Sequence, residues 1–189
     1  YTNIMVVWAI DKAFEVLNLI ADIAGEVKSR LNLSDEELAK WKDISRKMNV
    51  VISPEGIISQ YDGYFDLEEL DWDYYRKNYG NIYRLDRILK AEGKSADEFK
   101  VAKQADTLMA FYNLDDAEVR EILEELGYNM KDEYLKENLA YYLARTSHGS
   151  TLSRVVHALL ANMIGDRKLS WELYQDALSS DYNDIQGGT

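Results

Sequence analysis

The sequence predicts an all-α protein, an antiparallel array of roughly eight helices with short connections. Two observations carry this prediction. The 189 residues include one proline and ten glycines, so few residues interrupt a helix. Apolar side chains recur every three or four residues in successive segments, which is the period of one helix face. Hydrophobic residues make up 47% of the chain, enough to fill a core, and we expect residues 1–189 to form a single domain.

The first segment predicts two helices. Residues 3–26 carry a narrow polar stripe and apolar side chains over the rest of the circumference, a pattern typical of a helix buried on several sides. Ser34 and Glu37 have the spacing of a capping box, in which a hydroxyl and a carboxylate each bind a free backbone N–H. The helix that follows has a single apolar stripe, so it is expected to keep one face in water.

The middle of the chain is less regular. Residues 49–80 lack a helical period, and Pro54 and Gly56 predict a turn. Further helices are predicted over residues 81–92, 104–113, 117–126 and 131–144.

The final third contains the clearest helix. Its apolar residues between 152 and 164 recur without a gap, and Gly165 ends the run. A polar loop is expected before it, over residues 145–150. Another helix is predicted around residues 171–178, and residues 181–189 are expected to form a loop.

Charge and composition exclude several kinds of function. Lys and Arg total 22 and Asp and Glu total 34, which gives a net charge of −12. Such a chain repels phosphate backbones and anionic lipids, so neither nucleic acid nor a membrane is an expected partner. The absence of cysteine excludes disulfides and thiolate metal sites. We find no apolar run of about 20 residues and no secretory leader, and expect a cytoplasmic protein. Because the first residue is Tyr1, we expect a longer polypeptide.

The densest polar cluster is the segment RTSHGSTLS at residues 145–153. It contains five hydroxyls, an imidazole, a guanidinium and a glycine directly before a predicted helix. A helix N-terminus exposes N–H donors and a partial positive charge, so this cluster predicts a pocket for an anion such as phosphate. The alternative is an ordinary Ser/Thr cap beside a solvated loop.

A second polar cluster is the segment KQAD at residues 103–106. Lys103 offers a point charge, and Gln104 and Asp106 offer directional hydrogen bonds suited to sugar hydroxyls. The alternative is a solvated helix start.

The sequence has two histidines, His148 and His157. Neither has a histidine four residues away and no HExxH motif occurs, so a metal site is not expected. His157 borders an apolar helix face and is expected to be a hydrogen-bonded core residue, whereas His148 is the functional candidate. The chain contains the residue types of a Ser-His-Asp catalytic triad, so a triad is an open alternative, although no GxSxG motif occurs.

Five segments, in the same order along the chain, resemble glycoside hydrolase family 65, the maltose, kojibiose and trehalose phosphorylases. The resembling segments are Tyr1-Thr2-Asn3 with Trp8, QYDGYF at 60–65, KQAD at 103–106, the set Thr146, His148, Ser150 and Ser153, and Gly165-Asp166 with DIQGGT at 184–189. Thr151 departs from the commonest family pattern, in which many members have serine, but keeps a hydroxyl.

The resemblance implies an (α/α)6 barrel, or toroid, with its active site at one end. This chain would then be an incomplete barrel of roughly eight helices, with the flanking β-domains and the segment bearing the catalytic acid outside it. The implied reaction is inverting phosphorolysis of an α-glucosyl disaccharide to β-glucose 1-phosphate and a sugar. Inorganic phosphate is the co-substrate and no cofactor is implied. The general acid is a glutamate that precedes the YTN segment, so no residue of this chain is named catalytic and the isolated chain is expected to be inactive.

The resemblance also implies roles for individual residues. Lys103 and Gln104 would bind glucosyl hydroxyls. In the loop, His148, Ser150 and Thr151 would bind phosphate. Thr146 would shape the loop, and Arg145 would add positive charge. The implied partners are the disaccharide, phosphate, the rest of the polypeptide and a second copy in a homodimer.

Two other functions stay open. One is a trehalase-like glycoside hydrolase on the same scaffold, in which a carboxylate takes the place of phosphate. The other is a non-catalytic helical scaffold that binds protein partners, although the chain shows no repeat of about 34 residues.

Overall fold

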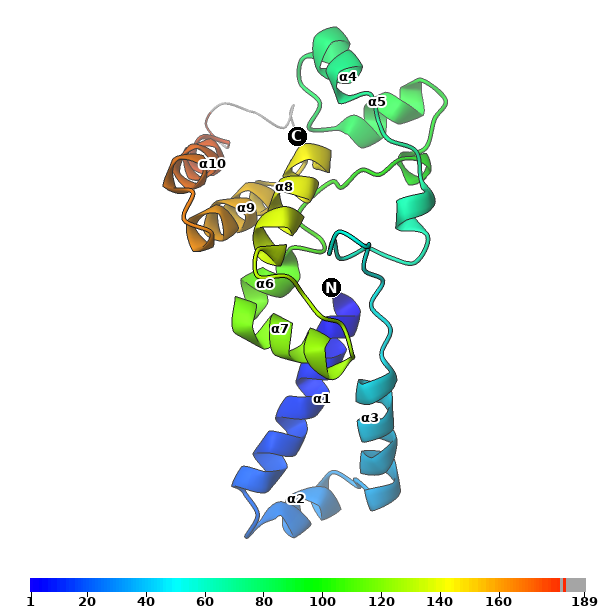
Figure 1. The fold of residues 1–189 in the computed structure, drawn as a ribbon, viewed down its shortest axis with the longest axis vertical. Coiled ribbons are helices and arrows are strands. Elements are labelled where there is room, and N and C mark those ends of the chain that lie inside the picture. Colours follow the sequence, from blue (N-terminus) through cyan, green and yellow to red (C-terminus); the bar gives the residue numbers. More distant parts are fainter. Residues whose placement is uncertain (181, 183–189) are drawn as a thin grey trace. The chain divides into compact units, whose positions relative to one another are not determined.

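The computed structural model describes residues 1–180 and 182, and they form a helical chain (Figure 1). Its α-helices are α1 Thr2–Leu19, α2 Ala24–Arg30, α3 Asp35–Lys47, α4 Trp72–Tyr79, α5 Leu85–Ala91, α6 Met109–Asn113, α7 Asp116–Glu125, α8 Tyr134–Arg145, α9 Thr151–Met163 and α10 Arg167–Ser179. Two 3-10 turns, η1 Tyr64–Asp66 and η2 Ala96–Glu98, complete the helical elements. Within the described residues, β pairing consists of three isolated bridges, so the predicted all-α class is confirmed.

The described chain divides into two compact units, which we treat separately. The first comprises Tyr1–Val50 and Asp116–Met130, and the second comprises the other described residues. The predicted loop at 181–189, apart from Tyr182, and the DIQGGT segment at 184–189 lie outside the described residues.

In the first unit, α1 packs against α3 and α7. The prediction of one helix over residues 3–26 is wrong, because α1 ends at Leu19 and a turn precedes α2. The amide of Ile23 donates to the Ile20 carbonyl at 2.9 Å, and Gly25, a poor helix former, is the second residue of the next helix. The expectation of burial on several sides is not met in this unit either, since Leu19 is 77% exposed.

Helix α3, the second helix that the sequence predicts, begins at the expected place. The Glu37 amide donates to the Ser34 hydroxyl at 3.1 Å, which is one of the two expected capping-box bonds. A box with both bonds occurs instead at η2, between its N-cap residue Ser95 and its third residue Glu98.

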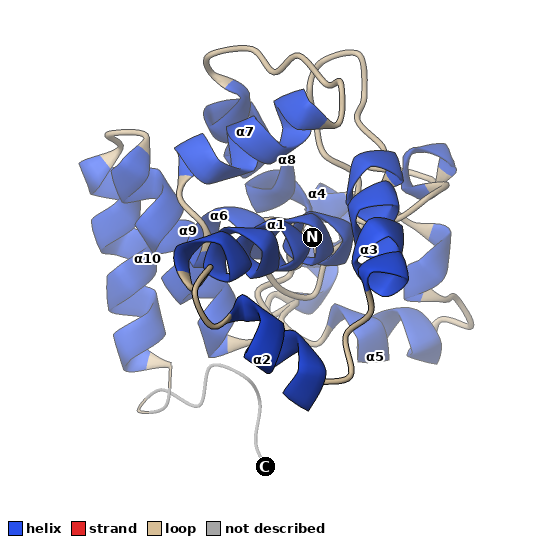
Figure 2. Ribbon diagram, turned by 90° about the horizontal axis from the view of Figure 1, so that it is seen from below, coloured by secondary structure: helices blue, strands red, loops and turns tan. Residues whose placement is uncertain are grey.

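In the second unit, α9 is the central helix and contacts α6, α8 and α10 (Figure 2). It buries Val156 and Leu160 completely. Helix α10 lies alongside α9. Of the four apolar residues that predicted α10, three are exposed: Trp171 at 58%, Tyr174 at 44% and Leu178 at 57%. The fourth, Ala177, is buried as expected, together with Leu173.

Helix α4 is absent from the sequence prediction, which treated residues 49–80 as irregular. The local signals for it are present: the Asp71 carboxylate caps it by accepting from the Tyr74 amide at 2.9 Å, and Gly80, at φ 65°, ends it. Its many tyrosines hid the apolar period. Tyr75 is buried in a small core with Leu85 and Leu89 of α5.

The buried side chain of Asn138 fastens the turn around Pro54 to α8, and the Tyr142 hydroxyl adds a bond to the Ile58 carbonyl. The amide oxygen of Asn138 accepts from the Ile58 amide at 2.8 Å, and its amide nitrogen donates to the carbonyls of Gly56 and Tyr134 at 2.9 and 2.8 Å. Asn138 is fully buried, so these bonds hold residues 56–58 at a fixed place on the helix.

None of the described helices has both the length and the apolar character needed to cross a lipid bilayer.

Candidate functional site

The main chain joins the two polar clusters that the sequence singled out. The Ala102 amide donates to the Arg145 carbonyl at 2.8 Å, and the Ser147 amide donates to the Ala102 carbonyl at 2.9 Å. One step further, the Gly149 amide donates to the Lys103 carbonyl at 2.9 Å. Segments more than 40 residues apart in sequence therefore run side by side as a short parallel bridge.

This pairing corrects the predicted helix over residues 104–113. The KQAD segment lies outside any helix, and α6 begins only at Met109. The backbone groups of Ala102 and Lys103 bond to the loop before α9, so they are unavailable for helix bonds. Gln104 donates to the Asp106 carboxylate at 3.3 Å, which orders the side chains of the segment.

Gly149 sits where no other residue fits. An ideal Cβ atom at this position would lie 2.6 Å from the carbonyl oxygen of Tyr83 and 3.1 Å from Cγ of Lys103. Real carbon atoms do not approach a carbonyl so closely, and the backbone at Tyr83 cannot easily retreat. The glycine therefore lets three chain segments converge at the loop.

The loop ends at the N-terminus of α9, where Ser150 is the N-cap residue. Its hydroxyl makes no capping bond, and its carbonyl accepts from the Ser153 amide at 3.1 Å. The Thr151 hydroxyl lies 3.2 Å from that of Ser180. A cap hydroxyl that is not used for capping can bond to a ligand at the positive end of the helix.

His148 is held in an uncommon backbone conformation at φ 54°, which non-glycine residues rarely adopt. Its Nδ1 lies 3.0 Å from the Ser153 hydroxyl, and its ring meets that of His157 edge-on at a centroid distance of 4.8 Å. Burial, the neighbouring His157 and the nearby Arg154 lower the pKa of His148 to about 3. The imidazole is therefore neutral near pH 7 and contributes hydrogen bonds rather than charge.

His157 is a core residue, as predicted. It is fully buried, and its Nδ1 donates to the Ser153 carbonyl at 2.7 Å. Burial lowers its pKa too. Its Nε2 is buried and makes no hydrogen bond within the described residues.

Arg145, which was expected to add charge to the loop, faces a carboxylate instead. Its Nε and Nη2 donate to the two oxygens of Glu69 at 3.1 and 3.0 Å, and its guanidinium lies 3.8 Å from the Tyr141 ring centroid. The charge of Arg145 is therefore paired. Thr146 is buried, and its hydroxyl donates to the Tyr142 carbonyl at 2.6 Å, which ends α8 and shapes the start of the loop.

Sequence reasoning missed a cation next to the loop, Arg154. This side chain is 2% exposed, donates to the His148 carbonyl at 3.4 Å, and lies 4.5 Å from the ring centroid of Tyr83. The available signal was an arginine as the fourth residue of a helix that is mostly apolar after it.

Three of the motif segments meet at one cavity of about 200 Å³ in the second unit. Gln60 and Tyr61 come from the QYDGYF segment, Lys103 from KQAD and Ser147 from the loop before α9. Asp86 and Asp97 complete its polar lining. Hydroxyl, amide, ammonium and carboxylate groups around a small cavity suit a ligand with many hydroxyls.

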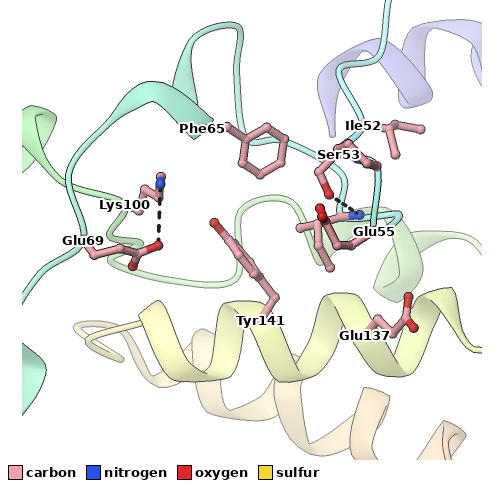
Figure 3. A pocket seen from close by; sticks show the side chains of 10 residues that line it. Ile52, Ser53, Glu55, Phe65, Glu69, Lys100, Glu137 and Tyr141 are labelled. Atoms are coloured by element: carbon pink, nitrogen blue, oxygen red, sulfur yellow. Dashed lines mark hydrogen bonds and ion pairs between the residues drawn. The ribbon is translucent and has the colours of Figure 1, made fainter.

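A larger cavity of about 750 Å³ lies over α8 in the same unit (Figure 3). Tyr141 points from α8 towards Phe65, and their ring centroids are 6.3 Å apart. The Lys100–Glu69 ion pair, at 3.6 Å, borders one side. The sequence did not predict this cavity.

In the part of the chain that the structure describes, no three His, Cys, Asp or Glu side chains are grouped so that they could hold a metal ion.

The whole chain, residues 1–189, matches the model of the glycosyl hydrolase family 65 central catalytic domain. The chain belongs to this family. An uncharacterized glycosyl hydrolase of Mycobacterium tuberculosis is 47% identical over 191 residues, which cover 100% of this chain and 14% of that protein. The trehalose 6-phosphate phosphorylase of Lactococcus lactis is 42% identical over 189 residues, 100% of this chain and 23% of that protein.

A solved structure titled "Putative kojibiose phosphorylase from human microbiome" superposes with a TM-score of 0.72 at 26% identity, and covers 98% of this chain and 24% of that one. This match confirms the predicted fold class, the helical barrel of the family. The chain thus spans a quarter or less of the length of these family 65 proteins.

Proposed function

We propose that the protein containing this chain is a disaccharide phosphorylase. It would cleave an α-glucosyl disaccharide with inorganic phosphate, invert the anomeric centre, and release β-glucose 1-phosphate and a second sugar. Inorganic phosphate is the co-substrate, and the reaction needs no other cofactor. The observation that supports this most is the main-chain pairing that places the loop before α9 beside Lys103.

In this proposal the loop binds the phosphate. The Ser150 hydroxyl, which is not used for capping, and the N-terminus of α9 offer donors to an anion. If His148 Nδ1 accepts from the Ser153 hydroxyl, its proton sits on Nε2 and supplies a further donor. Phosphate held there would attack the anomeric carbon, taking the place that water and a general base occupy in an inverting hydrolase.

The sugar would occupy the cavity that Gln60, Lys103 and Ser147 line. Gln104 stands next to Lys103 and, with Lys103, would bond to the glucosyl hydroxyls. The general acid is proposed to lie on another part of the polypeptide, since no glutamate of this chain occupies the family position that the resemblance implies.

The substrate to test first is trehalose 6-phosphate. The Lactococcus lactis relative that is named for this substrate is 42% identical to the chain, whereas the structure titled as a kojibiose phosphorylase is 26% identical. Trehalose, kojibiose and maltose are the comparison substrates.

The test is a product assay on the full-length protein. Each of the four disaccharides is incubated with and without inorganic phosphate, and β-glucose 1-phosphate and free glucose are quantified. Phosphate-dependent β-glucose 1-phosphate from one substrate is expected. Free glucose at the same rate with and without phosphate would identify a hydrolase and contradict the proposal.

A pair of variants then tests the loop. Ser150→Ala and His148→Asn each remove one donor, and asparagine tolerates the left-handed backbone at position 148. Charge-assisted bonds contribute about 1.5–3 kcal/mol, so each variant should raise the KM for phosphate about ten- to a hundredfold. An unchanged KM in both variants would exclude the loop as the phosphate site.

A further inference from the structure

We propose that Arg154 is the cation that neutralises a phosphate group bound at the loop before α9. The inference rests on the proposed function, because it names the charge that the phosphate site requires. The observation behind it is that the buried Arg154 guanidinium lies beside the His148 carbonyl and the Tyr83 ring, at the start of α9.

The first argument is the distribution of positive charge around the loop. Arg145 is bonded through both sides of its fork to Glu69. His148 is buried and neutral near pH 7. Lys103 is exposed to solvent. Arg154, at 2% exposure, is thus the buried cation of this site.

The second argument is the cost of leaving such a charge without a counter-ion. Within residues 1–180 and 182, no carboxylate forms an ion pair with Arg154, and its guanidinium makes one long hydrogen bond although it carries five N–H donors. The Tyr83 ring recovers part of the desolvation cost through a cation–π contact. A buried charge that lacks a partner is strongly unfavourable, and an anionic ligand removes that penalty.

The third argument is position. Arg154 is the fourth residue of α9, so its charge adds to the partial positive charge of the helix N-terminus. The chain as a whole carries a charge of −12, so an anion needs a strong local positive potential to bind. The planar fork of arginine also matches two oxygens of a phosphate group.

Two molecules could bring the phosphate group: inorganic phosphate, or the phosphate ester of a substrate such as trehalose 6-phosphate. The recognition chemistry is the same for both, and the experiment separates them.

The experiment compares Arg154→Gln, Arg154→Lys and a control, Arg167→Gln, in the full-length protein. Arg167 is exposed at the start of α10, beyond the far end of α9, about 20 Å from the loop along that helix. Two quantities are measured: the shift of Tm on adding inorganic phosphate or unreactive sulfate, and the KM for phosphate and for each disaccharide.

We expect Arg154→Gln to abolish the stabilisation by phosphate and to raise one KM at least tenfold, while the control matches the wild type. Arg154→Lys should lie between them, because lysine keeps the charge but loses the fork. Without phosphate, Arg154→Gln should be at least as stable as the wild type, since it removes an unpaired buried charge. A tenfold change in the KM for inorganic phosphate assigns Arg154 to that molecule, and a change confined to trehalose 6-phosphate assigns it to the ester.

A purely structural role gives a different pattern. Arg154→Gln would then lower the Tm without phosphate and leave the KM for phosphate and the phosphate-induced shift unchanged, which overturns the inference. If that variant does not fold, an Arg154→Lys protein with wild-type affinity for both phosphate sources overturns it as well. A wild-type protein that shows no phosphorolysis but an Arg154-dependent shift with phosphate would refute the proposed function and leave the anion site standing.

Discussion

Gly149 and Lys103 are joined through their backbones, with the Gly149 amide donating to the Lys103 carbonyl at 2.9 Å. Main-chain atoms therefore hold these two distant motifs together, and their contact does not depend on side-chain rotamers. The Tyr83 carbonyl oxygen also packs against Gly149, since a Cβ atom on that residue would lie only 2.6 Å from it. The loop before α9 is therefore positioned by a backbone contact that only glycine permits.

Substitution of Gly149 should disturb both stability and ligand binding. We expect Gly149→Ala to lower the free energy of unfolding by about 1–3 kcal/mol, because the new methyl group collides with the Tyr83 carbonyl. The KM for phosphate should rise with it, since the loop must shift. Chemical denaturation and phosphate kinetics measure the two effects.

The matched control for this substitution is Gly25→Ala. Gly25 lies within α2, and nothing stands within 4 Å of its Cβ position. Alanine should stabilise this helix by about 0.5–1 kcal/mol. Equal effects of the two substitutions would show that the contact at Tyr83 does not constrain the loop.

Removal of the Asn138 amide should destabilise the second unit. In Asn138→Leu, the Ile58 amide and the Gly56 carbonyl lose their partners, and we expect a loss of about 2–4 kcal/mol. Asn78→Ala is the control, since its side chain bonds to the Tyr74 carbonyl at an exposed site, and it should change stability by about 0.5 kcal/mol or less. Unfolding curves of the two variants measure the difference, and similar curves would contradict the anchoring role.

The buried imidazole of His148 should make stability depend on pH. Its pKa is about 3 in the folded protein, below its ordinary value of 6.5, so the unfolded chain binds more protons between these values. Stability is therefore greatest above pH 6.5 and falls as the pH drops towards 3, by up to about 1.4 kcal/mol per pH unit for this group. The pKa of His157 is lowered as well, so it acts in the same direction.

His148→Asn isolates the contribution of His148. We expect its stability to fall less steeply between pH 6.5 and 4 than that of the wild type, as measured by denaturation at several pH values. Identical slopes would mean that the imidazole stays accessible to protons in the folded protein.

The Arg145–Glu69 pair should matter little to the phosphate site. The two side chains are 22% and 51% exposed, so the pair contributes about 0–1 kcal/mol to stability. Because the charge of Arg145 is directed to Glu69, we expect Arg145→Gln to change the KM for phosphate by about twofold or less. A tenfold rise would show that Arg145 also acts on the loop.

Local sequence signals predicted much of the fold, and each helix that was missed or misjudged has a local cause. The period of apolar residues located α9 closely, and Ser34 marked the start of α3. The same period misled at α10, where Trp171 and Leu178 lie on the exposed face, because periodicity identifies a stripe and not the surface that covers it. At α4, Asp71 and Gly80 were sufficient signals, but polar tyrosines obscured the stripe between them.

The sequence by itself determined the helical class, the family resemblance and the choice of residues 103–106 and 145–153 as the chemical segments, because these depend on residue types and short spacings. Only the tertiary structure decided that Arg145 is paired with Glu69, that His148 is neutral, and that Arg154 is enclosed beside the loop. The physical reason is that the surroundings of an ionisable side chain determine its protonation state and whether its charge is already paired. Burial and the nearest counter-ion set whether a cation is available to a ligand, and both come from residues far away along the chain.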